Sequence, residues 1–131
     1  MKVETFTPDG VMKPIGPYSH VAKAGPLLWI SGTAGVDPET GDLAGPDVAS
    51  QTRQILQSFR RLLESAGSDL DHVVHILIFL KDMSDFEKMN QVYAEELGPH
   101  RPARTVVAVS DLPKPGARLT MNLQAVVREE G

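Results

Sequence analysis

The clearest hydrophobic pattern in the chain lies between residues 48 and 63. Apolar side chains recur there every three or four positions, at Val48, Ile55, Leu56, Phe59, Leu62 and Leu63, with Thr52 filling the one gap. This spacing puts them on one side of a helix and leaves arginines and glutamines on the other. Asp47 is a suitable N-cap, and Gly67 is typical of the residue that follows a helix. The pattern predicts a long amphipathic helix packed against a core.

A second helix is predicted from residue 84 onward, because Ser84 and Glu87 have the spacing of a capping box. Its apolar stripe consists of Phe86, Met89, Tyr93 and Leu97. The Gly98-Pro99 pair that follows cannot continue a helix and predicts its end.

Shorter apolar runs predict strands over residues 3–7, 21–24, 27–31, 73–80, 104–109 and 119–127. The order of strands, helix, strand, helix and strands is typical of an α+β fold, with two helices on one face of a mixed sheet. The run over residues 73–80 is apolar on both faces, so both faces need cover. Two helices cover one face only. We therefore expect an obligate homo-oligomer, in which a partner subunit covers the other face.

Composition narrows the class of protein. The 131 residues suit one domain, which we expect to span residues 1–131. The chain has no cysteine, which excludes disulfides and thiolate chemistry. A net charge of −4 without a basic stripe argues against nucleic acid as a partner. No apolar run is long enough to span a membrane, and the N-terminus lacks a signal-like apolar core, so a cytoplasmic location is expected.

Few residues suggest chemistry by themselves. His72 and His75 have a spacing that resembles a metal motif, but residues three apart on a strand point to opposite faces, so we predict no metal site. Arg104 opens an apolar run directly after Pro102-Ala103. It could be a rim or salt-bridge residue, or a guanidinium that offers a two-pronged contact to a carboxylate. Spacing alone does not choose between these interpretations.

A set of short segments, taken in order, resembles the reactive intermediate deaminase (RidA/YjgF) family. They are Gly16-Pro17-Tyr18-Ser19-His20, Ser31-Gly32, Asp37-Pro38-x-Thr40-Gly41, Gln51-Thr52-Arg53-Gln54, Phe79-Leu80-Lys81-Asp82-Met83, Asp85-Phe86, Asn90-x-x-Tyr93, Pro102-Ala103-Arg104-Thr105 and Leu112-Pro113. No single segment is specific, but the ordered set covers nearly the whole chain, and consistent signals reinforce one another.

The resemblance implies a chorismate-mutase-like α+β fold assembled as a homotrimer with clefts between subunits. It implies hydrolysis of reactive enamines and imines, such as 2-aminoacrylate, to a keto acid and ammonia, with no metal or organic cofactor. By position, Arg104 matches the arginine that binds the substrate carboxylate. The other positions matching the cleft are Tyr18, Ser31, Gly32, Asn90 and Thr105.

The last strand departs from the family pattern. Aligned from the C-terminus, Asn122 stands where the family carries a glutamate thought to hold the water, and Gln124 where a second acid is common. Asparagine can hydrogen-bond a water but cannot take its proton. A longer loop before this strand leaves its register open, and Arg101 could add charge to the pocket or face solvent. A non-catalytic trimer that binds carboxylate metabolites is the alternative function. A nuclease or translation-inhibitor role, which the family's names suggest, is disfavoured by the acidic charge.

Overall fold

The computed structural model describes residues 1–129, so the last two positions of the expected domain lie outside the described residues. Its strands are β1 (Val3–Phe6), β2 (Val21–Ala24), β3 (Leu27–Ala34), β4 (Val73–Leu80), β5 (Ala103–Ala108) and β6 (Leu119–Val126). The helices are α1 (Val48–Ser65) and α2 (Phe86–Leu97). A short 3-10 turn, η1 (Leu70–His72), follows α1, and another, η2 (Met83–Asp85), directly precedes α2.

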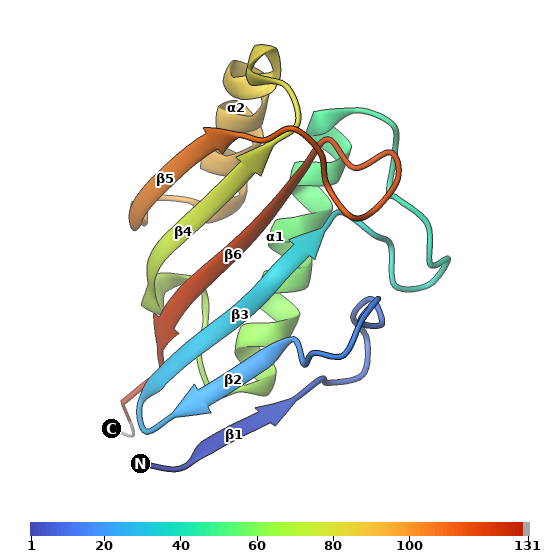
Figure 1. The fold of residues 1–131 in the computed structure, drawn as a ribbon. Helices are drawn as coiled ribbons and strands as arrows, with labels where there is room; N and C mark the ends of the chain where they lie inside the picture. The colour runs from blue at the N-terminus through green and yellow to red at the C-terminus, as the bar shows by residue number, and fades with distance from the viewer. Residues whose placement is uncertain (130–131) are drawn as a thin grey trace.

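The strands form one sheet in the order β1-β2-β3-β6-β4-β5. Among the strands of residues 1–129, the β4–β5 pair alone is parallel, and the other neighbours are antiparallel. Both helices lie on the same face of the sheet (Figure 1). The predicted α+β layout, with a mixed sheet and two helices on one face, is therefore confirmed.

The core lies between the helices and this face of the sheet. The predicted stripe of α1 is buried, and Ile55, Leu56 and Phe59 have no solvent exposure. They pack against the inward-facing side chains of the central strands, which are Ile76, Ile78, Leu80, Leu119, Met121 and Leu123. Burial of this apolar surface is the main force that holds the helices on the sheet.

The helix starts show one correct prediction and one error. Asp47 caps α1, since its Oδ2 accepts a hydrogen bond from the Ser50 backbone N–H at 3.0 Å. The capping box predicted at Ser84 is wrong. Ser84 lies inside the turn η2, where its backbone N–H donates to Asp82 Oδ1 at 2.9 Å, and Asp85 precedes the first residue of α2. The Asp82 carboxylate accepts from this N–H in an Asx turn, a local alternative to helical hydrogen bonding, and the helix therefore starts two residues later.

The second face of the sheet, which we call the open face, carries no helix. Leu27, Trp29 and Val107 lie on it with about two fifths of their surface exposed (42%, 41% and 39%), while Leu77 and Phe79 are half-buried. A register shift between Val73 and His75 interrupts the alternation at the start of β4 and leaves Val74 exposed. The apolar face that the sequence predicted is thus present, and nothing in the described part of the chain covers it. No helix of the described residues is long and apolar enough to cross a membrane.

Candidate functional site

A cavity of about 460 Å³ opens where the N-terminal loop meets β3 and β6. Its walls come from segments far apart in the chain: Met12, Ile15, Gly16, Tyr18, Ser31, Gly32, Ala34, Pro113, Lys114 and Thr120. Most of these residues are apolar, and Ser31, Thr120 and Lys114 contribute polar groups to the lining. An apolar pocket with a few convergent polar groups is the usual form of a small-molecule site.

A bulge in β3 exposes backbone to this cavity. The pairing of β3 with β6 shifts register between Ile30 and Thr33, so Ser31 and Gly32 are not paired with β6. A Cβ built on Gly32 would meet no atom within 4 Å, which means that this backbone faces open space. Bulges commonly turn backbone toward a ligand in this way.

The N-terminal loop forms a second wall and is tied to that bulge. The Ser31 hydroxyl donates to the Ser19 carbonyl at 2.6 Å, and the Ser31 N–H donates to the His20 carbonyl at 3.0 Å. Within the loop, the Ile15 N–H donates to the Tyr18 hydroxyl at 3.3 Å. The Ser31 hydroxyl proton is thus engaged in holding the loop, and toward a ligand this oxygen is an acceptor.

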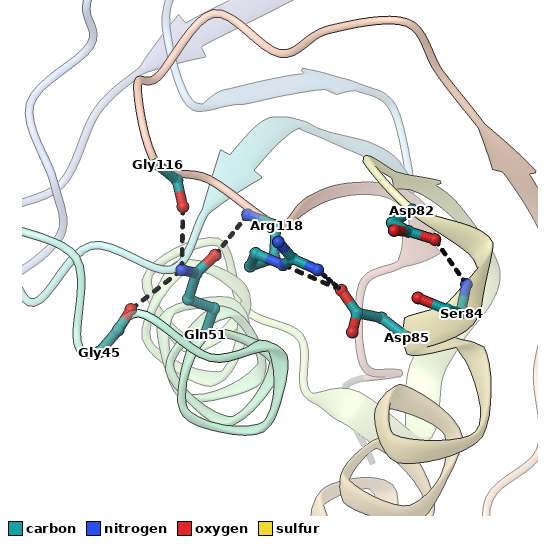
Figure 2. Close-up of polar contacts among 7 residues, drawn as sticks. All are labelled: Gly45, Gln51, Asp82, Ser84, Asp85, Gly116 and Arg118. Atoms are coloured by element: carbon teal, nitrogen blue, oxygen red, sulfur yellow. Dashed lines mark hydrogen bonds and ion pairs between the residues drawn. The ribbon is translucent and has the colours of Figure 1, made fainter.

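The third wall, residues 112–118, is held by the buried Gln51 of α1 (Figure 2). The Gln51 amide nitrogen donates to the carbonyls of Gly45, at 2.9 Å, and Gly116, at 3.2 Å, while its oxygen accepts from the Arg118 N–H at 2.7 Å. The Arg118 side chain in turn donates twice to Asp85 Oδ2, at 2.9 and 2.6 Å. Both ends of the buried Gln51 amide are hydrogen-bonded, and a movement of residues 112–118 would leave polar groups unpaired. The amide therefore holds this loop in one conformation.

Lys114 and Thr120 add to the polar character that Ser31 gives the cavity. Lys114 is the one charged residue among its described lining and is half-buried. Thr120 of β6 lies opposite Ala34 on β3 and Phe79 on β4. Asn122, which the sequence alignment placed at the cavity, lies two residues further along β6, opposite Leu77, and is not part of the lining.

Arg104 lies at a second location, on β5 at the edge of the sheet. One of its terminal nitrogens donates to Asn90 Oδ1 at 2.7 Å. The guanidinium carbon lies 4.9 Å from the centre of the Tyr93 ring and 5.7 Å from that of Phe86. No carboxylate of the described residues pairs with it. Four of the five N–H groups of the guanidinium therefore have no hydrogen-bond partner among the described residues.

The aromatic and amide groups around Arg104 come from one face of α2. Burial raises the pKa of the Tyr93 phenol, which keeps it neutral near neutral pH. A neutral ring face attracts the cation without cancelling its charge. Asn90 thus contacts the arginine and orients it, whereas the sequence suggested a direct contact between Asn90 and the substrate.

Thr105 and Arg101, the neighbours of Arg104, have other partners. Thr105 points to the open face, where its hydroxyl lies 3.1 Å from His75 Nε2, and His75 Nδ1 lies 3.3 Å from Gln124 Oε1. Arg101 donates to the Gly98 and His100 carbonyls at the end of α2. His72, treated as a strand residue when a metal motif was excluded, lies in the turn η1 and pairs with Asp69. Among residues 1–129, no three potential ligand side chains cluster as a metal site would require.

The structure brings the expected residues together in two groups. Tyr18, Ser31 and Gly32 line the cavity, and Asn90 contacts Arg104, but Arg104 is not part of the cavity lining. Three strand spacings separate β3 from β5, or about 14 Å. Within one chain, the two groups cannot hold the same small ligand.

Sequence reasoning did not name as site residues the other lining residues, which are Met12, Ile15, Gly16, Ala34, Pro113, Lys114 and Thr120. The Leu112-Pro113 segment matches the family pattern, and this match was the one sequence signal that could have pointed to Pro113 and the adjacent Lys114. The length of the following loop obscured the position of Thr120.

Comparison with known proteins gives a consistent result. A family model described as Endoribonuclease L-PSP matches residues 10–127. The chain is 49% identical over 114 residues to a RutC family protein of Pyrococcus horikoshii, covering 87% of this chain and 90% of that protein. It is 38% identical to the 3-aminoacrylate deaminase RutC of Acinetobacter baylyi, covering 89% and 92% of the two chains.

Solved structures agree with these sequence matches. RidA from an Antarctic Psychrobacter species superposes with a TM-score of 0.89 at 32% identity, covering 95% of this chain and 99% of that chain. The YjgF gene product of E. coli gives the same TM-score, identity and coverage. The fold that the sequence predicted is the fold of these proteins.

Proposed function

Since the chain belongs to the RidA/YjgF family, which includes a deaminase of 3-aminoacrylate, we propose that it hydrolyses reactive enamines and imines derived from amino acids. The products are a 2-keto acid and ammonia. The observation that carries this proposal is Arg104, a half-buried guanidinium oriented by Asn90 and two aromatic rings and unpaired with any described carboxylate. Such a group is suited to the carboxylate that these substrates share.

We propose that the site is completed by assembly. The cavity beside β3 and the arginine on β5 lie on different parts of one chain, and the open face carries exposed apolar side chains. A homotrimer that buries the open face would set the Arg104 edge of one subunit beside the cavity of its neighbour. Each of the resulting clefts would then contain both groups.

The reaction in such a cleft needs few groups. Arg104 fixes the carboxylate, which aims the adjacent C=N carbon at a water molecule. The water oxygen adds to that carbon while nitrogen gains a proton, and the resulting carbinolamine then loses ammonia to form the carbonyl. Thr120 and the Ser31–Gly32 backbone line the cavity, and in the proposed reaction they hydrogen-bond the water or the developing hydroxyl group. Holding the reactants in this geometry accelerates such reactions by roughly several orders of magnitude.

A second function is favoured by one observation. None of the described residues that line the cavity is a carboxylate, so the lining offers no carboxylate base to take a proton from water. A trimer that only binds keto acids or related carboxylates would use the same arginine without chemistry.

One assay separates these two functions. Serine dehydratase generates 2-aminoacrylate, and semicarbazide traps the imine that has not been hydrolysed. For an enzyme we expect the wild type to lower the semicarbazone yield, Arg104→Ala to lose most of this effect and Arg104→Lys to lose it in part. An unaccelerated reaction across imines from several amino acids, together with saturable pyruvate binding that Arg104→Ala abolishes, would establish the binder instead.

A further inference from the structure

His20 is a fully buried histidine next to the cavity, and the chemistry proposed above does not use it. It has no solvent exposure, and its Nε2 lies 2.8 Å from the Met12 carbonyl oxygen. Its other ring nitrogen, Nδ1, has no hydrogen-bond partner among the described residues. A buried polar atom without a partner needs an explanation, because such atoms are rare in folded proteins.

The contact with Met12 fixes the form of the imidazole. A carbonyl oxygen only accepts, so Nε2 must carry the hydrogen and donate it. In the neutral ring, Nδ1 then holds a lone pair, which can remain unpaired at modest cost. Protonation would add an N–H at Nδ1 and a positive charge to the ring, in a buried place that offers neither acceptor nor counter-ion, so the charged ring gains stability by leaving this place for water even though Nε2–H could still donate to Met12.

The hydrogen-bonding and ring partners of His20 among the described residues carry no charge. They are the Met12 carbonyl, the Thr7 hydroxyl that accepts from the His20 N–H at 3.0 Å, the Ser31 N–H, and the Tyr18 ring. Tyr18 is the one titratable group in this set, and its ring meets that of His20 edge-on, with centroids 5.6 Å apart. Burial accordingly lowers the pKa of His20 below its ordinary value of 6.5.

The bond to Met12 spans the segment that forms one wall of the cavity. Met12, Ile15, Gly16 and Tyr18 all line the cavity. At the C-terminal end of the segment, Ser31 donates hydrogen bonds to the carbonyls of Ser19 and His20. At the N-terminal end, the His20 ring donates to the Met12 carbonyl. Loss of the ring contact would release the N-terminal end and leave the C-terminal end in place.

We propose that His20 is a positioning residue, whose neutral ring clamps the loop of residues 12–18 as a wall of the cavity and whose protonation releases that wall. The inference rests on the proposed function only for its activity readout. The ligand contacts remain those of the cavity and of Arg104, and His20 acts through Met12 and Tyr18. The site is therefore closed near neutral pH and loosens on acidification.

His20→Gln tests this directly, because a glutamine amide can donate to Met12 and does not titrate. Hydrogen exchange of the amides of residues 12–18 is compared at about pH 7.5 and about pH 5.5, with protection corrected for intrinsic rates. We expect protection in the wild type to fall by up to about tenfold at the lower pH, and in His20→Gln to change less than about twofold. His20→Phe, which cannot donate, should show low protection at both values.

The activity readout follows the same pattern. With 2-aminoacrylate, we expect the kcat/KM of the wild type to fall on acidification more steeply than that of His20→Gln, and His20→Phe to be impaired at both pH values with a raised KM. His72→Gln, which removes a histidine at the opposite end of the sheet, should keep the wild-type profile.

Two results would overturn the inference: wild-type protection of residues 12–18 that does not change with pH, or an equal change in His20→Gln. Both are measured without turnover. A wild type that shows the protection change but no imine hydrolysis would refute the proposed function and leave the clamp in place.

Discussion

A mixture of two inactive variants can show whether the cavity and Arg104 that meet in a cleft come from different copies of the chain. The first variant, Arg104→Ala, keeps the cavity and loses the guanidinium. The second, Gly32→Leu, keeps Arg104 and fills the cavity. Gly32 suits this purpose because its backbone has no positive φ and an added Cβ meets nothing within 4 Å, so the new side chain projects into open space without strain.

The expected magnitudes follow from the geometry. Removal of a half-buried guanidinium from a carboxylate costs about 3 kcal/mol, or about a hundredfold in kcat/KM. In a trimer each cleft would draw its cavity from one subunit and its arginine from the next. After random mixing in equal amounts, about one quarter of the clefts would combine an intact cavity with an intact arginine, so activity should recover to about 25% of wild type.

The assay is semicarbazone trapping after the two variants are unfolded and refolded together, with each variant refolded alone as its control. Different affinity tags confirm that mixed oligomers have formed, and light scattering gives their mass. Mixed oligomers with no more activity than the separate variants would refute a site shared between chains. Recovery near one half would also contradict the arrangement, because two independently donated parts cannot restore so many clefts.

Three further predictions follow from particular side chains. Thr120→Glu should raise the rate of imine hydrolysis about tenfold or more, because it places a general base in the cavity. Asn122→Glu should leave the rate unchanged. A larger gain from Asn122→Glu than from Thr120→Glu in the trapping assay would show that the alignment from the C-terminus, which put Asn122 at the family's glutamate, was correct. Val107→Asp puts a charge on the open face, so we expect the variant to sediment as a dissociated monomer. The fluorescence emission of Trp29, the single tryptophan, should shift to longer wavelength as this face becomes exposed to water. A wild type that itself sediments as a monomer would contradict this prediction. The unfolded chain binds a proton at His20 more readily than the folded chain does, so this contribution to stability is complete above about pH 6.5 and is lost as the pH falls toward the lowered folded-state pKa. Urea unfolding should show a slope of at most about 1.4 kcal/mol per pH unit in that window, reduced in His20→Gln, and equal slopes would disprove the assignment.

The sequence by itself determined the elements and the fold class. The stripe on α1 and the cap at Asp47 appear where the periodicity placed them, because helix burial and capping depend on residues three or four positions apart. The ordered short segments also identified the family, since many weak local matches add up. The start of α2 was missed because Asp82 and Ser84 form a turn that competes locally with the helix.

Only the tertiary structure decided which residues share a site. The bulge at Ser31 and Gly32, the Gln51 contacts that hold residues 112–118, and the position of Thr120 depend on strand register, which a loop of altered length leaves undetermined in sequence. The separation of Arg104 from the cavity has the same origin, because the order of strands in the sheet differs from their order in the chain. Local patterns determine which side chains are buried, whereas distances between remote segments are set by how the sheet pairs.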